Sequence, residues 1–488
     1  MTALSNRATY DKLLELVDRH APDFVALSDR VWTMPETCYA EHRSAAEHRA
    51  MLEAEGFRVT NELGGIPTAL MGEAGSGGPV IAILGEFDAL ANLSQEAGAF
   101  EHRPLAEGHN GHGCGHNLLG SASMLAATAL KDWLAETGTS GRVRYYGCPA
   151  EEGGAAKSFL VKAGAFDDVD IAISWHPSDF LEVVRRTSLA NCRVDFTFTG
   201  TSSHAGAAPY LGRSALDAAE LMSVGVNYLR EHMQSDCRIH YAYLDAGGIS
   251  PNVVQSSAKV RYVVRAPNRN AMLELVERVR KVAAGAAMMT ETTVTSAMIS
   301  AVSNLIPSPP LEDAMQDVLE LLGPPAFDDD DRAFATRMRE TFNAADIASA
   351  WKSVAEAERN VPLCDFVVPP SSRREPIGGS TDLGDVSWIV PTVQVHSPTC
   401  AIGTQLHSWQ MVAQGQSAMA HKGMIRASEV MALTGMRAFE DSALRSRAAG
   451  ALADAVGPAG YKSALPDAAK APVAEMSALA VKPPEYAA

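Results

Sequence analysis

The segment Gly108-His109-Asn110-Gly111-His112-Gly113-Cys114-Gly115-His116-Asn117 places three histidines and one cysteine among four glycines. Thiolate and imidazole are ligands for ions such as Zn²⁺, and glycines let a backbone turn tightly enough for Cys114 and His116 to face one ion. The alternative is a polar glycine-rich loop whose histidines are incidental. The composition favours a metal-binding loop, and the rest of the chain decides between these two interpretations.

Length and composition indicate a soluble globular protein. With 488 residues the chain exceeds the size of one core, which predicts about two to three domains. Its 58 acidic and 41 basic residues give a net charge of −17, which disfavours nucleic acid and anionic membranes as partners. An anionic substrate would therefore need local basic groups.

The distribution of apolar residues and the spacing of the cysteines predict the cellular compartment. The first fourteen residues lack a charged segment followed by an apolar one, and no run reaches about 18 consecutive apolar residues. The seven cysteines are widely spaced and form no C-x-x-C pair, which argues against a disulfide framework. We therefore expect a cytoplasmic, non-membrane protein with reduced thiols.

Three predicted strands are expected in the core of an α/β fold, and each is followed by a side chain that can bind metal. Residues 79–84 are apolar on both faces, as expected for a strand of a covered, mostly parallel sheet. Open α/β sheets place their ligands at the carboxyl ends of such strands. The segments and the side chains that follow them are residues 79–84 with Glu86 and Asp88, residues 142–148 with Glu151 and Glu152, and residues 170–175 with His176.

Helical periodicity predicts the elements that cover this sheet. The acidic run 328–331 predicts a solvated turn, with a cation site as the alternative. A loop at 378–385 precedes a further strand at 392–395, and the Ala- and Pro-rich residues from about 440 predict a poorly ordered extension. The expected helices are residues 10–30, 44–55, 118–136, 310–322, 334–354 and 414–433.

Residues 187–301 change in character and predict an inserted domain. Alternating strands and amphipathic helices follow the order β-α-β-β-α-β, which is that of a ferredoxin-like unit. Its edge strands need cover, which a second copy would provide, so we expect a homodimer through the insert. Segments 201–206 and 250–252 are chemically unusual for a mere interface. The predicted organisation is a catalytic domain formed by residues 1–186 and 302–440, the insert at 187–301, and an extension at 441–488.

Four motifs, in this order, resemble those of the M20 metallopeptidase and amidohydrolase family. The Cys-Gly-His segment is similar to the amidohydrolase branch, where a cysteine-containing loop replaces the usual bridging aspartate, and within that branch to the aminobenzoyl-glutamate type. The resemblance covers about residues 10–440 and implies an M20-type catalytic domain with an inserted lid or dimerisation domain. The motifs are Gly-His-Gly-Cys-Gly-His-Asn-Leu-Leu-Gly at 111–120, Pro-Ala-Glu-Glu-Gly-Gly at 149–154, Ser-Ser-His-Ala-Gly at 202–206 and Leu-His-Ser-Trp-Gln at 406–410.

The resemblance implies a metal centre with two divalent ions per chain. Cys114 would bridge the ions, which would be Zn²⁺ or Mn²⁺, with Co²⁺ as a further option. Glu151 would be the general base, and Asp88, at the end of its strand, would support the site from behind the ligands. The residues that would complete the metal shells are His116, Glu152, His176 and His407.

The resemblance also implies how substrate is bound. His204 would donate to the oxyanion from across the dimer, and Asn252 and Arg265 would contact the substrate carboxylate. The alternative for His204 is a strand-end side chain whose hydrogen bonds are satisfied by its own loop. A guanidinium matches a carboxylate with two parallel hydrogen bonds, which answers how an acidic protein holds an anion.

Three residues depart from the family pattern. Asn117 stands where many members have aspartate, although the aminobenzoyl-glutamate type shares asparagine. Glu86 occupies the place of a histidine ligand of the peptidase branches, so their standard metal shell is not expected. His396 is an alternative to His407, which we prefer because it fits the closing motif. The other loop histidines, His109 and His112, receive no role.

The expected function is hydrolysis of the amide bond of an N-acyl or N-aroyl amino acid with a free carboxylate. The most specific candidate substrate is p-aminobenzoyl-glutamate. The alternatives are other N-acyl amino acids such as indole-acetyl conjugates, dipeptides, and a catalytically silent protein that supports a related partner chain. A silent protein would have no physical need for both the base and the ligands, so the sequence favours an enzyme.

Overall fold

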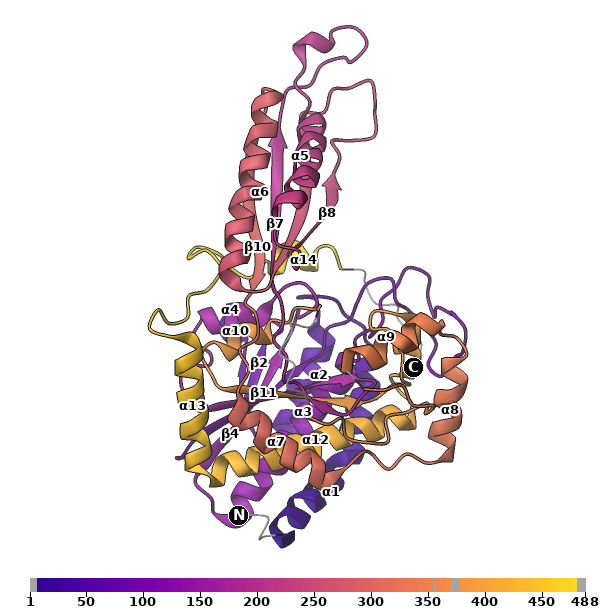
Figure 1. The fold of residues 1–488 in the computed structure, drawn as a ribbon, viewed down its shortest axis with the longest axis vertical. Coiled ribbons are helices and arrows are strands. Elements are labelled where there is room, and N and C mark those ends of the chain that lie inside the picture. Colours follow the sequence, from indigo (N-terminus) through magenta and orange to yellow (C-terminus); the bar gives the residue numbers. More distant parts are fainter. Residues whose placement is uncertain (1–6, 355, 371–377, 481–488) are drawn as a thin grey trace.

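Two β-sheets organise the molecule in this computed structural model (Figure 1). The structure describes residues 7–354, 356–370 and 378–480. One sheet belongs to a rounded body, and the other stands away from it in an elongated insert (Figure 1). The last part of the predicted extension, 481–488, lies outside the described residues.

The sheet of the body has seven strands and is mixed, which corrects the prediction of a mostly parallel sheet. The strands are β1 (Arg58–Asn61), β2 (Leu70–Ser76), β3 (Val80–Glu86), β4 (Gly141–Cys148), β5 (Ile171–Ser178), β6 (Glu182–Val183) and β11 (Thr392–Pro398). Their order is β1-β2-β4-β3-β5-β11-β6. The four central strands run parallel, whereas β1, β2 and β6 pair antiparallel with their neighbours. A short connection lets β1 turn back onto β2, while parallel neighbours require a longer crossover.

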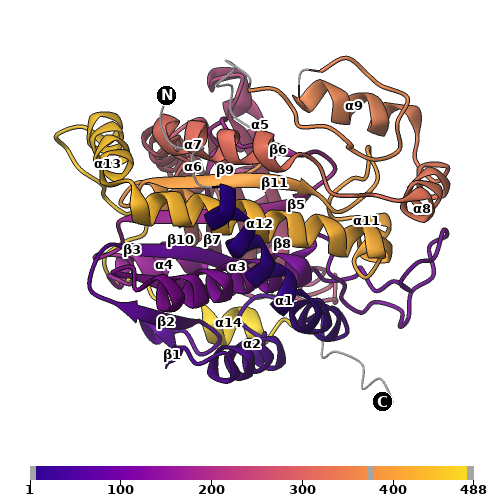
Figure 2. The same cartoon turned by 90° about the horizontal axis from the view of Figure 1, so that it is seen from below.

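Long helices cover one face of this sheet. The helices of the body are α1 (Arg7–Trp32), α2 (His42–Ala54), α3 (His116–Thr137), α4 (Ala156–Lys162), α7 (Pro309–Leu322), α8 (Asp329–Arg339), α9 (Ala344–Val354), α10 (Leu383–Ser387), α11 (Trp409–Gln414), α12 (Ala418–Glu440) and α13 (Ser442–Val456). α1, α3 and α12 lie side by side against the strands (Figure 2). Successive residues of a strand point to opposite faces. Ile81 and Ile83 of β3 accordingly pack into this helical core, and Ala82 packs into the core on the other face.

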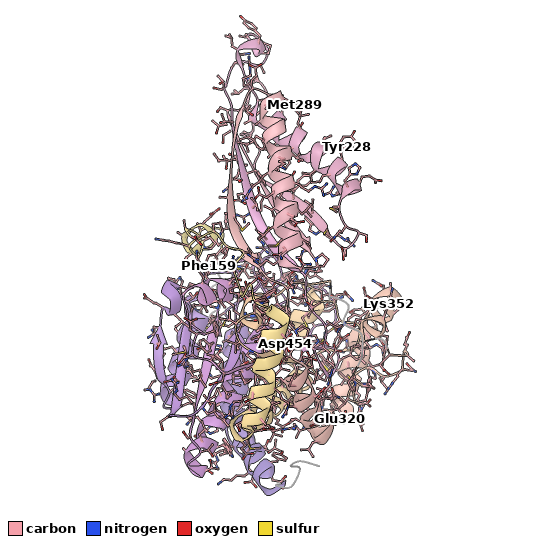
Figure 3. The ribbon with its side chains drawn as sticks, turned by 60° about the vertical axis from the view of Figure 1, so that its left-hand side comes forward. Phe159, Tyr228, Met289, Glu320, Lys352 and Asp454 are labelled. Atoms are coloured by element: carbon pink, nitrogen blue, oxygen red, sulfur yellow. The ribbon has the colours of Figure 1, made fainter. Side chains whose placement is uncertain are left out.

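The insert has the predicted order of elements. They are β7 (Ala190–Thr199), α5 (Ala215–Leu229), β8 (Arg238–Asp245), β9 (Ser257–Ala266), α6 (Arg269–Met289) and β10 (Thr293–Val302). The sheet is antiparallel with order β10-β7-β9-β8, so β8 is an edge strand. Tyr228 and Met289 mark the exposed ends of the two helices (Figure 3), with 75% and 67% of their surface accessible.

The parallel strands explain why the predicted site residues converge. β3, β4, β5 and β11 share one direction, so their carboxyl ends meet at the same edge of the sheet. Glu86 ends β3, Glu151 follows β4, and His176 lies near the end of β5. Helix α3 begins at His116 at the same edge. The fold thus brings together residues that are up to about ninety positions apart in the sequence.

The acidic run is a helix start, which corrects the predicted solvated turn. Asp328 caps α8, accepting a hydrogen bond of 3.0 Å from Asp331 N, while the Asp331 carboxylate accepts one of 3.0 Å from Asp328 N. Carboxylates at a helix N-terminus satisfy free amides and oppose the helix dipole. Lys422 of α12 pairs with both side chains. Hence the cluster is occupied by protein groups.

The chain beyond α12 is packed rather than loosely ordered as predicted. After α13, residues 457–480 with α14 (Val473–Ser477) run along the junction of body and insert (Figure 1). Lys162 of α4 donates to backbone carbonyls of Pro466 and Asp467, at 2.7 Å each. Glu475 lies 3.3 Å from Lys259 of β9 in the insert. Contacts to backbone carbonyls need no hydrophobic periodicity, which is why the sequence pattern did not reveal them.

Two further expectations concern cysteines and membranes. All seven cysteines lie within the described residues and are free thiols, as predicted. Among the described helices, none has the length and apolar character needed to cross a lipid bilayer.

Candidate metal centre

The glycine-rich loop packs closely against two other segments of the site. Gly115, directly before α3, has a φ of 74°, a left-handed conformation that suits glycine. A Cβ at this position would lie 3.0 Å from Pro177 on β5. The Gly113 carbonyl accepts a hydrogen bond of 2.8 Å from the backbone N–H of His407. The glycines therefore let the loop approach the segments that carry the other predicted ligands.

All five predicted metal ligands lie in two groups that share one thiol. In each group, one donor atom per residue lies within 4.8 Å of the others. Cys114 Sγ is 3.4 Å from His176 Nε2, and His407 Nε2 is 3.2 Å from Glu152 Oε1. Two donors bound to one tetrahedral zinc ion are about 3.4 Å apart, given bonds of about 2.1 Å. The groups are Cys114, His116 and His176, and Cys114, Glu152 and His407.

The chemistry of these donors fits a cation. His116 Nε2 is buried, has no hydrogen-bond partner among the described residues and lies 3.3 Å from Glu86 Oε2. Burial raises the pKa of the Cys114 thiol far above its usual value, so a thiolate requires a neighbouring cation. Burial lowers the pKa of His176 to about 4, which keeps its imidazole in the neutral form that binds metal.

Asp88, predicted to support the site, contacts the central histidine of the donor groups. Its Oδ1 lies 3.0 Å from His116 Nδ1, and its Oδ2 accepts a hydrogen bond of 3.0 Å from Glu152 N. A proton on Nδ1 that is donated to a carboxylate leaves Nε2 free as a ligand. Asp88 therefore fixes the direction in which His116 presents its donor atom.

Glu151 lies in the same cleft, next to the first donor group. One of its carboxylate oxygens lies within 4.8 Å of donor atoms of Glu86 and His116. Burial, together with the charges of Glu86 and Glu152, raises the pKa of Glu151 well above its usual value. Arg193 of β7 holds the turn by donating to the Glu152 carbonyl at 3.0 Å. The insert thus helps to fix the position of this carboxylate.

The cleft over the donor groups has a volume of about 660 Å³ and is lined by both body and insert. Arg265 of β9 reaches into it and donates to the Ser380 hydroxyl at 3.2 Å. No ion pair of Arg265 is found among the described residues, so its charge is available to a ligand. A cleft that joins metal donors to a free guanidinium can hold an anionic substrate beside a cation.

The structure does not bring the other two predicted residues to this cleft. His204 and Asn252 do not line it. They lie close together in loops of the insert, where His204 forms a β-bridge with Val253 and Ala205 N donates to the Asn252 carbonyl. The His204 ring accepts hydrogen bonds of 3.1 Å from two backbone amides of its own loop. Within one chain, these residues are remote from the metal donors.

His396 lines the cleft but belongs to neither donor group. Its Nδ1 is 3.2 Å from Glu182 Oε1, and the centroid of its ring lies 6.1 Å from the ring centroid of His176. His407, by contrast, has a φ of 60°, an unusual conformation for a side-chain-bearing residue that is common at functional sites. The geometry therefore favours His407 over its rival.

Sequence reasoning missed a buried lysine beside the centre. Lys157 has none of its surface exposed and pairs with Glu86 and Asp382. The available signal was a single charge within the apolar run 155–161, because a lysine on a buried helix needs carboxylate partners. Its partner Asp382 directly precedes α10, within the segment 378–385 that the sequence predicts as a loop.

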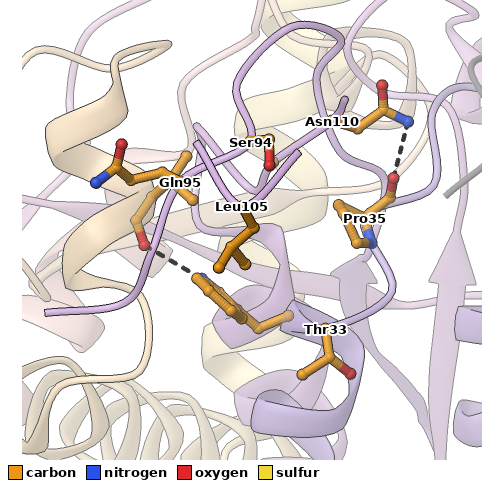
Figure 4. Close-up of a pocket in the computed structure, with 9 residues that line it drawn as sticks. Thr33, Pro35, Ser94, Gln95, Leu105 and Asn110 are labelled. Atoms are coloured by element: carbon orange, nitrogen blue, oxygen red, sulfur yellow. Dashed lines mark hydrogen bonds between the residues drawn. The ribbon is translucent and has the colours of Figure 1, made fainter. Parts of the chain in front are cut away.

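A second, smaller cavity is lined in part by residues of the glycine-rich loop (Figure 4). Its volume is about 100 Å³, and its lining includes Trp32, Leu105 and Asn110 but none of the predicted site residues. Asn110 Nδ2 donates to the Pro35 carbonyl at 2.9 Å, which braces the loop from this side. His112 is also bound on this side, with its Nε2 3.1 Å from the Val31 carbonyl. These residues support the loop from behind.

Comparison with known proteins shows which sequences this chain resembles. Residues 82–356 match the model of Peptidase family M20/M25/M40. One subunit of p-aminobenzoyl-glutamate hydrolase from Escherichia coli K12 is 44% identical over 432 residues, which cover 86% of this chain and 90% of that protein. The other subunit of the same organism's hydrolase is 30% identical over 49% of this chain and 56% of its own length.

A solved structure supports the same fold. A Bacillus subtilis protein described as a dinuclear metal-binding peptidase from the M20 family superposes with a TM-score of 0.55. The match covers 87% of this chain and 99% of that protein, at 16% sequence identity. At this level of identity, the likeness concerns the α/β fold.

Proposed function

Because the chain belongs to peptidase family M20/M25/M40, we propose that this metal-dependent amide hydrolase cleaves N-aroyl amino acids, with p-aminobenzoyl-glutamate as its substrate. The observation that carries the proposal is the pair of donor groups joined by Cys114, next to a carboxylate and a free guanidinium in one cleft. The E. coli relative, 44% identical, supports the choice of acyl group. A complete set of donors and base argues against a catalytically silent chain.

The proposed centre contains two divalent ions, one in each donor group. Thiolate and imidazole suit Zn²⁺, and the carboxylate of Glu152 also accepts Mn²⁺ or Co²⁺. When bound, such a pair lowers the pKa of a shared water and polarises the scissile carbonyl.

The protein's own groups position and move the proton. Glu151 stands beside the first donor group and accepts a proton from the attacking water. The same carboxyl group then delivers the proton to the leaving nitrogen, so the amine departs neutral. Asp88 keeps His116 Nε2 directed at the centre throughout.

Arg265 is proposed to bind the free carboxylate of the amino acid. Arg265→Ala should lower kcat/KM for a free-carboxylate substrate by about 10- to 100-fold, the worth of a hydrogen bond to a charged group. For the amidated analogue, kcat/KM should fall far less. Amine release from both substrates measures the ratio.

Arg261→Ala serves as the matched control. It removes a guanidinium from the same strand, but Arg261 pairs with Asp195 and does not line the cleft. Arg265 does not bind the substrate carboxylate if Arg265→Ala lowers kcat/KM equally for the free-carboxylate substrate and its amidated analogue.

A homodimer through the insert is proposed because of the apolar surface exposed there. Tyr228 and Val224 of α5 have 75% and 50% of their surface accessible, and Tyr241 on edge strand β8 has 40%. Exposed apolar patches beside an unpaired strand edge are typical of interaction surfaces. A second copy would cover them, and a related chain is the alternative, since the two E. coli relatives are named as different subunits of one hydrolase.

The dimer explains the remote position of His204 if each insert serves its partner's site. A 1:1 co-expression of His204→Ala and Glu151→Gln chains should then restore about a quarter of wild-type activity. Half of the dimers are mixed, and each mixed dimer has one of its two sites complete. Purified single variants provide the baseline. Activity no higher than their mean would contradict a shared site.

A further inference from the structure

A buried charge cluster lies against the metal centre without a role in the steps above. Lys157, in the first turn of α4, has none of its surface exposed. Its Nζ is 2.6 Å from Glu86 Oε1 and 2.6 Å from Asp382 Oδ1. Its backbone N–H donates to the other Asp382 oxygen at 2.9 Å. One cation thus joins the end of β3 to the start of α10.

This cluster leaves one carboxylate oxygen uncommitted. Burying a lysine is unfavourable unless carboxylates pair with it. Burial alone would lower the pKa of Lys157, but Asp382 and Glu86 raise it well above its usual value. Asp382 uses both of its oxygens on Lys157, whereas Glu86 uses only Oε1. The second Glu86 oxygen is buried and has no hydrogen-bond partner among the described residues.

That oxygen faces the donor atom of His116. Glu86 Oε2 is 3.3 Å from His116 Nε2, which is also buried and without a hydrogen-bond partner among the described residues. Asp88 already occupies Nδ1 of the same ring, so an ion must approach from the Nε2 side. The spacing is close to the distance of about 3.4 Å between two donors on one tetrahedral ion.

We infer that Glu86 is an additional ligand of the ion held at His116, and that Lys157 is the residue that positions it. Lys157 fixes Glu86 through Oε1, so that Oε2 is presented as a single oxygen donor. Two hydrogen bonds from Lys157 to Asp382 hold the lysine in place. The lysine therefore would not follow Glu86 if that carboxylate rotated away. The inference rests on the proposed metal-dependent function and goes beyond the five ligands described above.

Glu86→Gln tests the ligand directly in cobalt-substituted protein. The variant keeps the size of the side chain and an oxygen for Lys157 but removes the charge. The visible absorption of Co²⁺ should change toward that of a lower coordination number. Chelator competition should show one of the two ions bound at least about 10-fold more weakly, and the other unchanged.

Lys157→Met tests the positioning role. The variant should bind the same ion about 10- to 100-fold more weakly, as expected when a group that orients a metal ligand is lost. Lys157→Arg keeps the charge and should restore part of the affinity. The matched control is Arg144→Met, because Arg144 is also nearly buried and pairs with Glu73 and Asp168 but lies in no donor group.

The outcomes separate this inference from the proposed function. An unchanged cobalt spectrum and unchanged affinities in Glu86→Gln would overturn the inference, whatever the fate of Lys157→Met. If Lys157→Met lowers only thermal stability, as Arg144→Met is expected to, Lys157 does not position a ligand. Wild-type protein that binds no divalent ion would instead contradict the metal centre itself.

Discussion

Glu151→Gln should lower kcat by about 10²- to 10⁴-fold, the usual contribution of a general acid–base group. The amide cannot take a proton from water, but it keeps the size and polarity of the side chain. Glu151 lies near donor atoms of Glu86 and His116 but in neither of the two donor groups that share Cys114, and as the proposed proton-transfer residue it should leave the metal content unchanged when replaced. Steady-state kinetics, metal analysis and a thermal melt of the same preparation check these three expectations.

Glu152→Gln provides the comparison for that experiment. Glu152 is a member of the second donor group, so its variant should lose metal as well as activity. If Glu151→Gln retains turnover, another group abstracts the proton. If it loses metal as Glu152→Gln does, Glu151 is a ligand and the roles assigned to the two carboxylates are wrong.

Removal of the metal should abolish hydrolysis reversibly. Protein treated with a chelator is expected to regain activity on addition of Mn²⁺, Zn²⁺ or Co²⁺. Cys114→Ala should not recover, because Cys114 belongs to both donor groups. Its activity should stay more than about 100-fold below wild type, since even groups that only orient metal ligands contribute 10- to 100-fold.

Cys148→Ala is the control for the loss of a buried thiol. Cys148 is buried at the end of β4 but belongs to neither donor group. It should bind metal and turn over substrate like the wild type. Equal losses in the two cysteine variants would indicate a packing defect rather than a lost ligand.

Several candidate site residues could be predicted from the sequence because they lie close in sequence to the ends of buried strands. The apolar run of β3, the carboxylates after β4 and the histidine near the end of β5 could be predicted directly, since each strand is short and buried. The composition of the loop before His116 favoured a metal-binding loop over a merely polar one. These features depend on neighbours in the sequence, so no long-range pairing was needed.

The remaining features depend on contacts between distant segments. The direction of β1 and β2 follows from their pairing with each other and with β4, which periodicity does not encode. Lys157 meets Asp382 across 225 positions, so its buried role is visible only in three dimensions. The separation of His204 from the metal donors of its own chain is likewise visible only in three dimensions.

The most direct test of the account is amine release from p-aminobenzoyl-glutamate by metal-loaded wild-type protein. The panel should include indole-acetyl-aspartate and a dipeptide, with bound metal counted in the same sample. We expect two ions per chain and amine release that is fastest from the aminobenzoyl substrate. Two bound ions without amine release from any of these substrates would contradict it.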